Sequence, residues 1–317
     1  MSSLPAALIR WLTAALAALA AVTFPVEAAD SVQEDGRNAQ AFVVASYNLE
    51  NYLPTDRWVD GMRVKDAMKP EESILALINI IGTVKPDILG LVEMGDRDRL
   101  DDFQRRLREA GLEYPHVEWL KAHDEYRHLA LLSRFPIVSR DSRADVPFEL
   151  GGKQYRIGRG ILDVTVEPTP GFRLRLVGAH LKSKREVPEY DQAEFRGKEA
   201  WHLKRHISDI LEKDPDAKIL LWGDLNDTKN EYPIRELIGT RGTPDHLFDI
   251  WLTDSRGHRW THYWRTADLY SRIDYLMASP ALVPFLDLDK SGIADPPDWA
   301  TGSDHRLIYA VVDPSRK

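Results

Sequence analysis

Side chains that bind metals or transfer protons recur in this 317-residue sequence beside short apolar runs. These runs are typical of β-strands, and the polar residues follow their carboxyl ends or, in the last case, directly precede the strand. Strand ends on rigid sheets are the places where α/β proteins collect binding groups, so we expect these side chains to converge. The residues are Asn48, Glu93, His180, Asp224, Asn226, Asp304 and His305.

The types of group in this set predict a divalent-metal site. Buried carboxylates need partners or a metal, and carboxylate and amide oxygens are hard ligands. Because the sequence has no cysteine, these ligands favour Mg²⁺, Mn²⁺ or Ca²⁺ over a structural zinc. The two histidines can transfer or donate protons near neutral pH. Such a site suits a phosphodiester held by metal and imidazolium, with Asp224 orienting or deprotonating a water for in-line attack.

The first 28 residues have the layout of a secretory signal peptide. Arg10 precedes an apolar run over residues 11–24, and Val26-Glu27-Ala28 supplies a small-x-small cleavage pattern. The run is shorter than the ~20 apolar residues that a membrane span needs, and no later segment is apolar enough to span. We therefore expect a periplasmic or secreted protein, with an uncleaved N-terminal anchor as the alternative.

After the signal peptide, residues 29–40 are typical of a polar tail and residues 41–313 of one domain, because no linker or repeat divides them. The absence of cysteine excludes a disulfide scaffold, a thiolate metal site and a cysteine nucleophile. A net charge of −8 argues against a protein that coats nucleic acid with a broad basic face, although an enzyme can still grip phosphates locally. The sequence indicates no stable protein partner.

Predicted strands and helices alternate along the chain, but not in strict one-to-one order. Helical spacing of apolar residues predicts helices over 71–81, 99–110 and 192–212. This irregular alternation favours an α/β sandwich with mixed sheets over a regular parallel barrel. Strands are predicted over 41–49, 87–93, 128–132, 160–166, 174–180, 218–222, 273–277 and 307–312.

Seven short blocks resemble the endonuclease/exonuclease/phosphatase superfamily, which includes deoxyribonuclease-I-like nucleases, abasic-site endonucleases, bacterial sphingomyelinases and inositol polyphosphate phosphatases. One block alone carries little information, whereas seven in family order identify the family. The resemblance runs from about Phe42 to Val312 and implies a four-layer sandwich of two packed mixed β-sheets flanked by helices. The blocks are Tyr47-Asn48-Leu49-Glu50-Asn51, Leu91-Val92-Glu93, Leu131-Leu132-Ser133-Arg134-Phe135-Pro136, Gly178-Ala179-His180-Leu181, Gly223-Asp224-Leu225-Asn226, Arg272-Ile273-Asp274-Tyr275 and Gly302-Ser303-Asp304-His305.

The resemblance also implies a role for each matched residue. Glu93 stands where the family has its principal metal ligand, and Asn48 and Asp304 complete the metal shell directly or through water. Asp224 positions or activates the attacking water, and Asn226 holds Asp224 or a phosphate oxygen. The implied ion is Mg²⁺, with Mn²⁺ or Ca²⁺ as alternatives.

Two histidines complete the catalytic set that the resemblance implies. His305 contacts the scissile phosphate, while Asp274 fixes its ring and favours its charged form. His180 matches the second histidine of the deoxyribonuclease-like and sphingomyelinase-like branches, where abasic-site enzymes usually have tyrosine. In deoxyribonuclease-like enzymes a carboxylate supports this histidine. Here Asp124 and Glu125 both lie in the corresponding region, and the alignment does not choose between them.

Basic residues near these blocks are candidates for binding substrate phosphates. Lys182 and Lys184 follow His180 in a string that resembles secreted bacterial nucleases of the superfamily. Arg159 stands where family members often carry a phosphate-binding basic residue. A solvated basic loop is the alternative for the lysine run, which we interpret as a phosphate-binding loop. We interpret the basic side of the helix over 196–211 as a solvated face.

These patterns predict a metal-dependent phosphodiester hydrolase, with a nuclease acting on nucleic acid as the first hypothesis. A phospholipid or sphingomyelin phosphodiesterase and a small phosphate-ester phosphatase are the alternatives, because one catalytic centre serves them all. A non-catalytic binding protein is a third hypothesis. The sequence shows no obvious exposed aromatic hairpin for lipid binding, although one aromatic cluster could stack bases or meet a membrane instead of packing internally. That cluster comprises Trp251, Trp260, Tyr263 and Trp264.

Overall fold

The structure is a computed structural model that describes residues 40–59 and 61–316. The predicted signal peptide over 1–28 and nearly all of the predicted tail over 29–40 lie outside these residues, so export and the exact domain limits stay predictions. Within the described part of the chain, no helix is long and apolar enough to cross a membrane.

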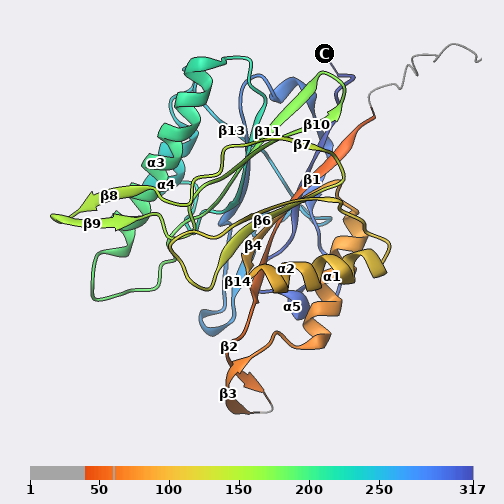
Figure 1. Cartoon of the computed structure of the whole chain (residues 1–317), viewed down its shortest axis with the longest axis vertical. Helices are drawn as coiled ribbons and strands as arrows, with labels where there is room; N and C mark the ends of the chain where they lie inside the picture. Colours follow the sequence, from red (N-terminus) through yellow and green to blue (C-terminus); the bar gives the residue numbers. More distant parts are fainter. Residues whose placement is uncertain (1–39, 60, 317) are drawn as a thin grey trace, which may run out of the picture. The chain divides into compact units, whose positions relative to one another are not determined.

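The first of two six-stranded sheets is mixed (Figure 1). Its one parallel pair, β1 and β4, carries two of the predicted site residues, Asn48 and Glu93. The other neighbours in this sheet are antiparallel. In order across the sheet, the strands are β17 (Leu286–Ile293), β18 (Ile308–Val312), β1 (Phe42–Tyr52), β4 (Ile88–Met94), β6 (His128–Ser133) and β5 (His116–Leu120).

The second sheet repeats this plan, with one parallel pair, β11 and β12, among antiparallel neighbours. Its strands in order are β13 (Phe248–Asp249), β16 (Asp274–Ala278), β12 (Ile219–Asp224), β11 (Phe172–His180), β10 (Leu162–Thr169) and β7 (Ile137–Arg140). Three hairpins form separate small sheets, namely β2 (Thr55–Val59) with β3 (Met62–Ala67), β8 (Pro147–Leu150) with β9 (Lys153–Arg156), and β14 (His262–Trp264) with β15 (Leu269–Ser271).

Helices cover the outer face of each sheet, as Figure 1 shows. The helices α1 (Glu71–Val84) and α2 (Arg97–Glu109) pack on the first sheet together with the short α5 (Trp299–Gly302). The helices α3 (Gln192–Lys213) and α4 (Tyr232–Ile238) pack on the second. Two helices begin at capping carboxylates, because Asp96 accepts from the backbone N–H of Arg99 and Asp191 accepts from those of Ala193 and Glu194.

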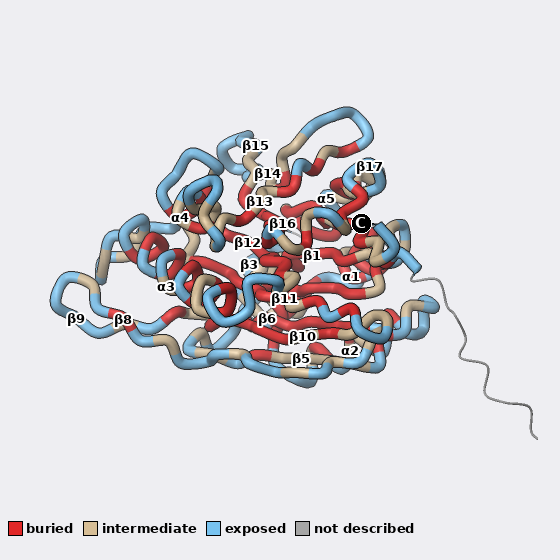
Figure 2. The backbone as a smooth tube through the Cα atoms, turned by 90° about the horizontal axis from the view of Figure 1, so that it is seen from above, coloured by how far each residue is buried: buried red, intermediate tan, exposed pale blue. Residues whose placement is uncertain are grey.

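Strand alternation divides the apolar side chains into three cores. In β1, Val44 faces the second sheet while Ala45 and Tyr47 face α1 and α2. In β12, Trp222 lies between the sheets while Leu221 faces α3 and α4. Figure 2 shows the buried strand segments in the interior and the exposed hairpins at the periphery. The four-layer sandwich predicted from the resemblance is therefore confirmed.

One tryptophan sets how closely the two sheets approach. Trp222 is 1% exposed, and its ring lies over Gly178 in the neighbouring strand and Gly90 in the facing sheet. A Cβ atom would lie 2.3 Å from this ring at Gly178 and 2.5 Å at Gly90. Glycine is required at both positions because real Cβ atoms do not approach a ring this closely.

The expectation of a solvated basic face on the helix over 196–211 is wrong for Arg196 and Lys204, although Lys198 and Arg205 are exposed. Arg196 is 2% exposed and Lys204 is 7% exposed, because this side of α3 packs against α4 and the loops that follow β11 and β12. Both cations are paired, Arg196 with Asp227 and Lys204 with Asp245. The sequence pattern could not reveal these partners, since each lies more than thirty residues away along the chain.

Candidate active site

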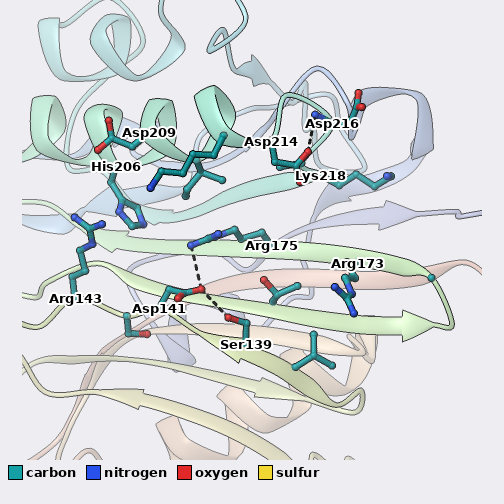
Figure 3. Close-up of a pocket in the computed structure, with 17 residues that line it drawn as sticks. Ser139, Asp141, Arg143, Arg173, Arg175, His206, Asp209, Asp214, Asp216 and Lys218 are labelled. Atoms are coloured by element: carbon teal, nitrogen blue, oxygen red, sulfur yellow. Dashed lines mark hydrogen bonds and ion pairs between the residues drawn. The ribbon is translucent and has the colours of Figure 1, made fainter.

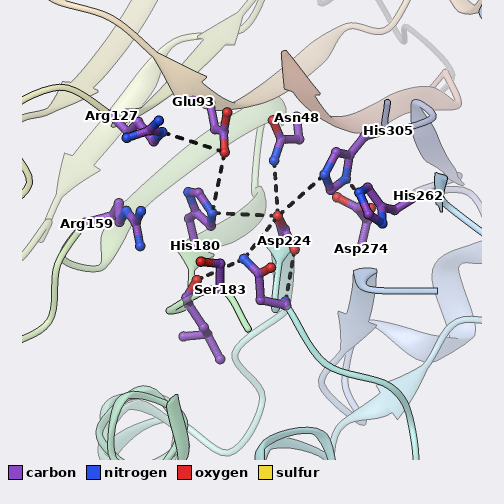
Figure 4. A network of polar contacts seen from close by, with 12 residues as sticks. Asn48, Glu93, Arg127, Arg159, His180, Ser183, Asp224, His262, Asp274 and His305 are labelled. Carbon is purple, nitrogen blue, oxygen red and sulfur yellow. Dashed lines mark hydrogen bonds and ion pairs between the residues drawn. The ribbon is translucent and has the colours of Figure 1, made fainter. Parts of the chain in front are cut away.

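Strand register brings the predicted catalytic residues of the second sheet side by side. His180 at the end of β11 is the register partner of Asp224 at the end of β12, and Asp224 is the partner of Asp274 at the start of β16. From the facing sheet, Asn48 in the second half of β1 and Glu93 near the end of β4 reach the same cluster (Figure 4).

The backbone turns sharply where it presents these side chains. Glu93 and Asn226 both adopt left-handed conformations, with φ of 61° and 53°. Non-glycine residues rarely take this conformation, which costs about 1–2 kcal/mol. At Gly223, φ is 135° and a Cβ atom would lie only 1.9 Å from the carbonyl oxygen of Ala179, so glycine is required directly before Asp224.

Asp224 lies at the centre of the cluster and is buried. Its Oδ2 accepts hydrogen bonds from the side-chain amides of Asn48 at 3.1 Å and Asn226 at 3.2 Å, and its Oδ1 accepts from the backbone N–H of Asn226 at 2.9 Å. Burial, together with the nearby carboxylate of Asp274, raises the pKa of Asp224 to about 7. A carboxylate with that pKa is suited to general base catalysis at neutral pH.

His305 is held by a carboxylate on one side and faces Asp224 on the other. Its Nδ1 lies 2.8 Å from Asp274, and its Nε2 lies 3.8 Å from Asp224. Burial alone would lower the pKa of His305, but the carboxylates of Asp274, Asp224 and Asp304 raise it well above its usual value. These carboxylates therefore favour the protonated form of His305.

His180 has the opposite electrostatic environment. Its Nε2 lies 3.6 Å from Asp224 and 3.9 Å from Glu93. Burial, reinforced by the cations of Arg159 and Arg127, lowers the pKa of His180 well below its usual value. The pKa values of the two histidines are thus shifted in opposite directions, and the neutral ring is favoured at His180.

Neither candidate carboxylate supports His180. Its Nδ1 is buried and has no hydrogen-bond partner among the described residues. Asp124 instead accepts from the backbone N–H groups of Tyr126 and Arg127 and lies 3.1 Å from Nε of Arg159, while Glu125 is exposed. The carboxylate that deoxyribonuclease-like enzymes place behind this histidine therefore has no counterpart at these two positions.

Comparison with known families decides the affiliation of the chain. The sequence model of the Endonuclease/Exonuclease/phosphatase family matches residues 45–305, most of the chain. The chain belongs to this family. Its members are hydrolytic phosphoesterases, so the chain is a phosphoesterase and the hypothesis of a non-catalytic binding protein is not supported.

Solved structures share the fold of this family member at low sequence identity. Truncated TDP2 from Caenorhabditis elegans has a TM-score of 0.56 at 21% identity, covering 86% of this chain and 98% of that one. The human nocturnin catalytic domain has a TM-score of 0.56 at 18% identity, covering 86% and 93%. Beta toxin from Staphylococcus aureus has a TM-score of 0.56 at 17% identity, covering 85% and 99%. A sequence comparison with curated proteins found no match.

Enzymes of the Endonuclease/Exonuclease/phosphatase family depend on divalent metals, and the donor groups here fit such an ion. Glu93 accepts from the backbone N–H of Asn51, and the nearest basic side chains, Arg127 and His180, both lie 3.9 Å from its carboxylate. Burial and the carboxylates of Asp304 and Glu93 raise the pKa of Glu50, so negative charge here is incompletely balanced. A divalent cation held by carboxylate and amide oxygens would balance it.

The other two predicted metal ligands lie at the edges of this acidic cluster. Asn48 has its Oδ1 bonded to the backbone N–H of Glu50, and Asp304 lies 3.6 Å from Nε2 of His262. Two groups of three side chains could each hold a metal ion, because their ligand atoms lie within 4.8 Å of one another. Both groups include predicted catalytic residues, and neither includes Glu93. They are His262, Asp304 and His305, and Asp224, Asp274 and His305.

The cluster opens into a cavity of about 1060 Å³ that is lined by six lysine and arginine side chains, here called the cationic wall, and by five carboxylates. Among the predicted substrate-binding residues, Lys182 donates only to oxygens of its own loop within the described residues, whereas Lys184 lies 2.8 Å from Asp227 and Arg159 lies 3.1 Å from Asp124. The basic residues of this cationic wall are Arg127, Arg156, Arg159, Lys182, Lys184 and Arg185.

Several residues at the site could not be found from the sequence. His262 lies beside His305, with ring centroids 4.6 Å apart, in a loop that carried no recognisable block. Lys69 is 4% exposed, and its ammonium lies 3.5 Å from the carboxylate of Glu50 and donates to the Glu50 carbonyl. No local pattern in the sequence singles out Lys69, because its partner Glu50 lies 19 residues away along the chain.

A second cavity, of about 750 Å³, lies between the last turns of α3 and strands β7, β10 and β11 (Figure 3). Its central charges already neutralise one another. Arg175 lies 2.6 Å from Asp163 and 3.3 Å from Asp141, and His206 lies 2.7 Å from Asp163. Because these groups satisfy each other and none of the seven family blocks lines this cavity, we place the active site at the first one.

Proposed function

We propose that the chain is an exported divalent-metal-dependent nuclease. The observation that carries this proposal is the cationic wall, which gathers six basic side chains in one cavity of a protein whose net charge is −8. Local positive charge beside a phosphoesterase centre favours a substrate with several phosphates over one with a single phosphate. Export is proposed from the predicted signal peptide over 1–28.

Asp224 accepts the proton of the attacking water and aims that water at phosphorus. Its Oδ2 is fixed by the amides of Asn48 and Asn226, so the carboxylate cannot rotate away from the cavity. Protonated His305 donates a hydrogen bond to a non-bridging phosphate oxygen, and Asp274 keeps its ring in place. Glu93, with Asn48 and Asp304 near it, would hold a divalent ion, which would supply positive charge to stabilise the negative charge of the transition state.

His180 contributes a neutral hydrogen-bond donor on the opposite side of Asp224 from His305. Burial lowers the pKa of His180, which favours the uncharged ring. A neutral imidazole ring can still donate a hydrogen bond from one nitrogen. A protonated ring at this position would be repelled by the guanidinium of Arg159. The two histidines thus hold two oxygens of one phosphate from opposite sides.

Purified protein should nick supercoiled plasmid or cleave RNA in the presence of Mg²⁺, and EDTA should stop the reaction. The Asp224→Asn protein, prepared in parallel, controls for contaminating nucleases. Sphingomyelin and phosphatidylcholine vesicles form the other arm of the test. Cleavage of vesicle lipids with intact plasmid and RNA would contradict the nuclease proposal while leaving the phosphodiesterase assignment in place.

A lipid phosphodiesterase is the second candidate, because two hairpins expose large apolar side chains. Trp58 and Met62 on the β2–β3 hairpin are 76% and 66% exposed, and Trp264 and Leu269 on the β14–β15 hairpin are 54% and 53% exposed. The expectation of no exposed aromatic hairpin is therefore wrong. Apolar side chains on a hairpin can meet a lipid surface, although Trp264 and Leu269 also line the cavity, where they can contact bases.

The aromatic cluster that kept this candidate open is divided in the structure. Trp260 packs against Tyr270, Trp299 and Arg306, as internal packing predicts. Trp251 is exposed, although the guanidinium of Arg259 covers its ring at 3.5 Å. These two side chains thus have partners within the protein, and Trp264 is the member of the cluster that is exposed at the cavity.

A further inference from the structure

The main chain of the loop after His180 is held by hydrogen bonds, beginning at its first residue. The N–H of Leu181 donates to the carbonyl of Asp224 at 3.0 Å, and the carbonyl of Leu181 accepts from the amide of Asn226 at 3.0 Å. This loop leads directly into Lys182 and Arg185 of the cationic wall. Loops that follow strands are usually mobile, so the extensive bonding of this one requires an explanation.

The bonds at Lys182 come from two buried charges of α3, one turn apart. Glu199 is 0% exposed, and its Oε2 accepts from the backbone N–H of Lys182 at 2.5 Å. Arg196 is 2% exposed and donates to the carbonyl of Lys182 at 3.1 Å. The two side chains thus hold the N–H and the C=O of one residue.

Each of these charges also reaches a second segment of the cavity. Oε1 of Glu199 accepts from the backbone N–H of Gly158 at 3.2 Å, directly before Arg159 of the cationic wall. Nε of Arg196 pairs with Asp227 at 2.8 Å, and the other oxygen of Asp227 lies 2.8 Å from Nζ of Lys184. Two side chains of α3 therefore tie together the segments that carry Arg159, Lys182 and Lys184.

A purely structural role explains this arrangement poorly. Burial raises the pKa of Glu199, as expected for a carboxylate removed from water at an energetic cost. Most other buried side chains of α3, such as Leu203 and Ile207, are apolar and carry no such cost. The remaining buried polar ones, Lys204 and His206, pair with Asp245 and Asp163, away from the active-site cavity. Glu199 and Arg196 lie where α3 faces the loops of the active site.

We infer that Glu199 and Arg196 are positioning residues, which hold the cationic wall as a fixed subsite for a non-scissile phosphate of a polyanionic substrate. This inference rests on the proposed nuclease function. Neither residue touches the scissile phosphate. They act by fixing the main chain at Gly158 and Lys182, so that the cations beyond are already in place when substrate arrives, which lowers the entropic cost of binding.

The test compares Glu199→Gln with wild type on two substrates, a short single-stranded oligonucleotide and bis(p-nitrophenyl) phosphate. Glutamine keeps the size of the side chain but has one accepting oxygen in place of two. One of the two backbone N–H groups therefore loses its hydrogen bond. For the oligonucleotide, KM should rise by about tenfold, and the slope of log KM against log salt should fall by about 0.7 for each substrate phosphate that the variant no longer binds. For the small diester, which lacks a second phosphate, kcat should stay within about twofold.

Lys204→Met on the same helix is the matched control, because it removes a buried charge that bonds to Asp245 and the carbonyl of Leu237 rather than the cavity loops. The control should leave both KM values and the salt slope unchanged. Equal losses on both substrates in Glu199→Gln, or the same KM shift in Lys204→Met, would overturn the inference. In the Lys182→Met background, Glu199→Gln should add little, because both changes act on the binding of one phosphate.

Hydrogen exchange keeps the inference testable if the proposed substrate is wrong. The backbone amides of Lys182 and Gly158 should exchange faster in Glu199→Gln than in wild type or Lys204→Met. Unchanged exchange would overturn the positioning role whatever the substrate. A wild-type protein that cleaves the small diester but no oligonucleotide would instead contradict the nuclease proposal, so the two failures are distinguishable.

Discussion

Nδ1 of His305 lies 2.8 Å from a carboxylate oxygen of Asp274, and both side chains are buried. The two residues come from different elements, since Asp274 begins β16 and His305 lies directly before β18 in the other sheet. Their bond therefore joins the two sheets at the active site. It also fixes the charge of the histidine, because a buried carboxylate this close favours the protonated ring.

Replacing this carboxylate should uncouple the charge of His305 from its position. In Asp274→Asn the ring keeps a hydrogen-bond partner, but the pKa of His305 should fall towards its usual value, as followed by NMR titration of the imidazole. We expect kcat on bis(p-nitrophenyl) phosphate to drop by about 100-fold, within the range for general acid–base groups. Asp245→Asn, on the far side of α3, should leave both measurements unchanged. An unaltered His305 titration would show that Asp274 does not set its charge.

Glu93 should govern how tightly the ion is held. In Glu93→Gln, we expect the affinity for Mg²⁺ measured by calorimetry to weaken by at least about tenfold, because a neutral amide replaces the carboxylate. Glu118→Gln is the control, since Glu118 pairs with Arg140 away from the cavity. A Glu93→Gln protein that binds Mg²⁺ as tightly as wild type would remove Glu93 from the metal site.

Asp163 should make stability depend on pH. Burial would raise the pKa of Asp163, but hydrogen bonds from His206 and Arg175 lower it below the usual value. A lowered pKa in the folded state stabilises the protein above the unfolded pKa, and that stability is lost as pH falls through the folded pKa. Asp163→Asn should therefore lower the free energy of unfolding by about 3–5 kcal/mol at neutral pH, with the gap to wild type narrowing below about pH 4.

Urea denaturation at a series of pH values measures this difference. Asp141→Asn serves as the control, because Asp141 pairs with the same Arg175 but is exposed, and its loss should cost at most about 1 kcal/mol. A gap between Asp163→Asn and wild type that stays constant down to about pH 3 would mean that Asp163 does not titrate as its partners indicate.

Gly178 should be intolerant of a side chain because of Trp222. A Cβ atom there would lie 2.3 Å from the ring, so Gly178→Ala should lower the free energy of unfolding by about 3 kcal/mol. Trp222→Leu should recover part of this loss in the double mutant, since the clash is with the ring itself. At Gly82 in α1, where no atom lies within 4 Å of a Cβ, alanine should be neutral or slightly stabilising. Additive losses in the double mutant would contradict this packing.

The strands and the residues at their ends could be predicted from the sequence because both depend on local pattern. Phe42 to Leu49 alternates apolar residues for two different cores, and β1 does begin at Phe42. The strand extends three residues further, to Tyr52. This extension passes through Glu50 and Asn51, whose left-handed conformations no apolar pattern signals. Likewise, the helix predicted over 71–81 continues to Val84 and ends at left-handed Lys85.

Groups whose role depends on a distant partner could not be predicted from the sequence. Glu199 looks like an ordinary helix residue until the structure places its carboxylate against Lys182 and Gly158. His262 belongs to no recognised block and approaches His305 only because the β14–β15 hairpin folds back beside the last strand. Asp124 was a reasonable partner for His180, but the turn at Tyr126 directs its carboxylate to the backbone and to Arg159.

Asp224 drives phosphodiester hydrolysis in a metal-dependent centre, according to the proposed mechanism. Hydrolysis of bis(p-nitrophenyl) phosphate tests this role of Asp224 directly, because such a small substrate does not need the cationic wall. We predict Mg²⁺-dependent hydrolysis by wild type, abolished by EDTA, with kcat lower by at least about 100-fold in Asp224→Asn, whose fold is verified by circular dichroism. Hydrolysis that persists in EDTA, or a folded Asp224→Asn protein with the wild-type rate, would contradict the account.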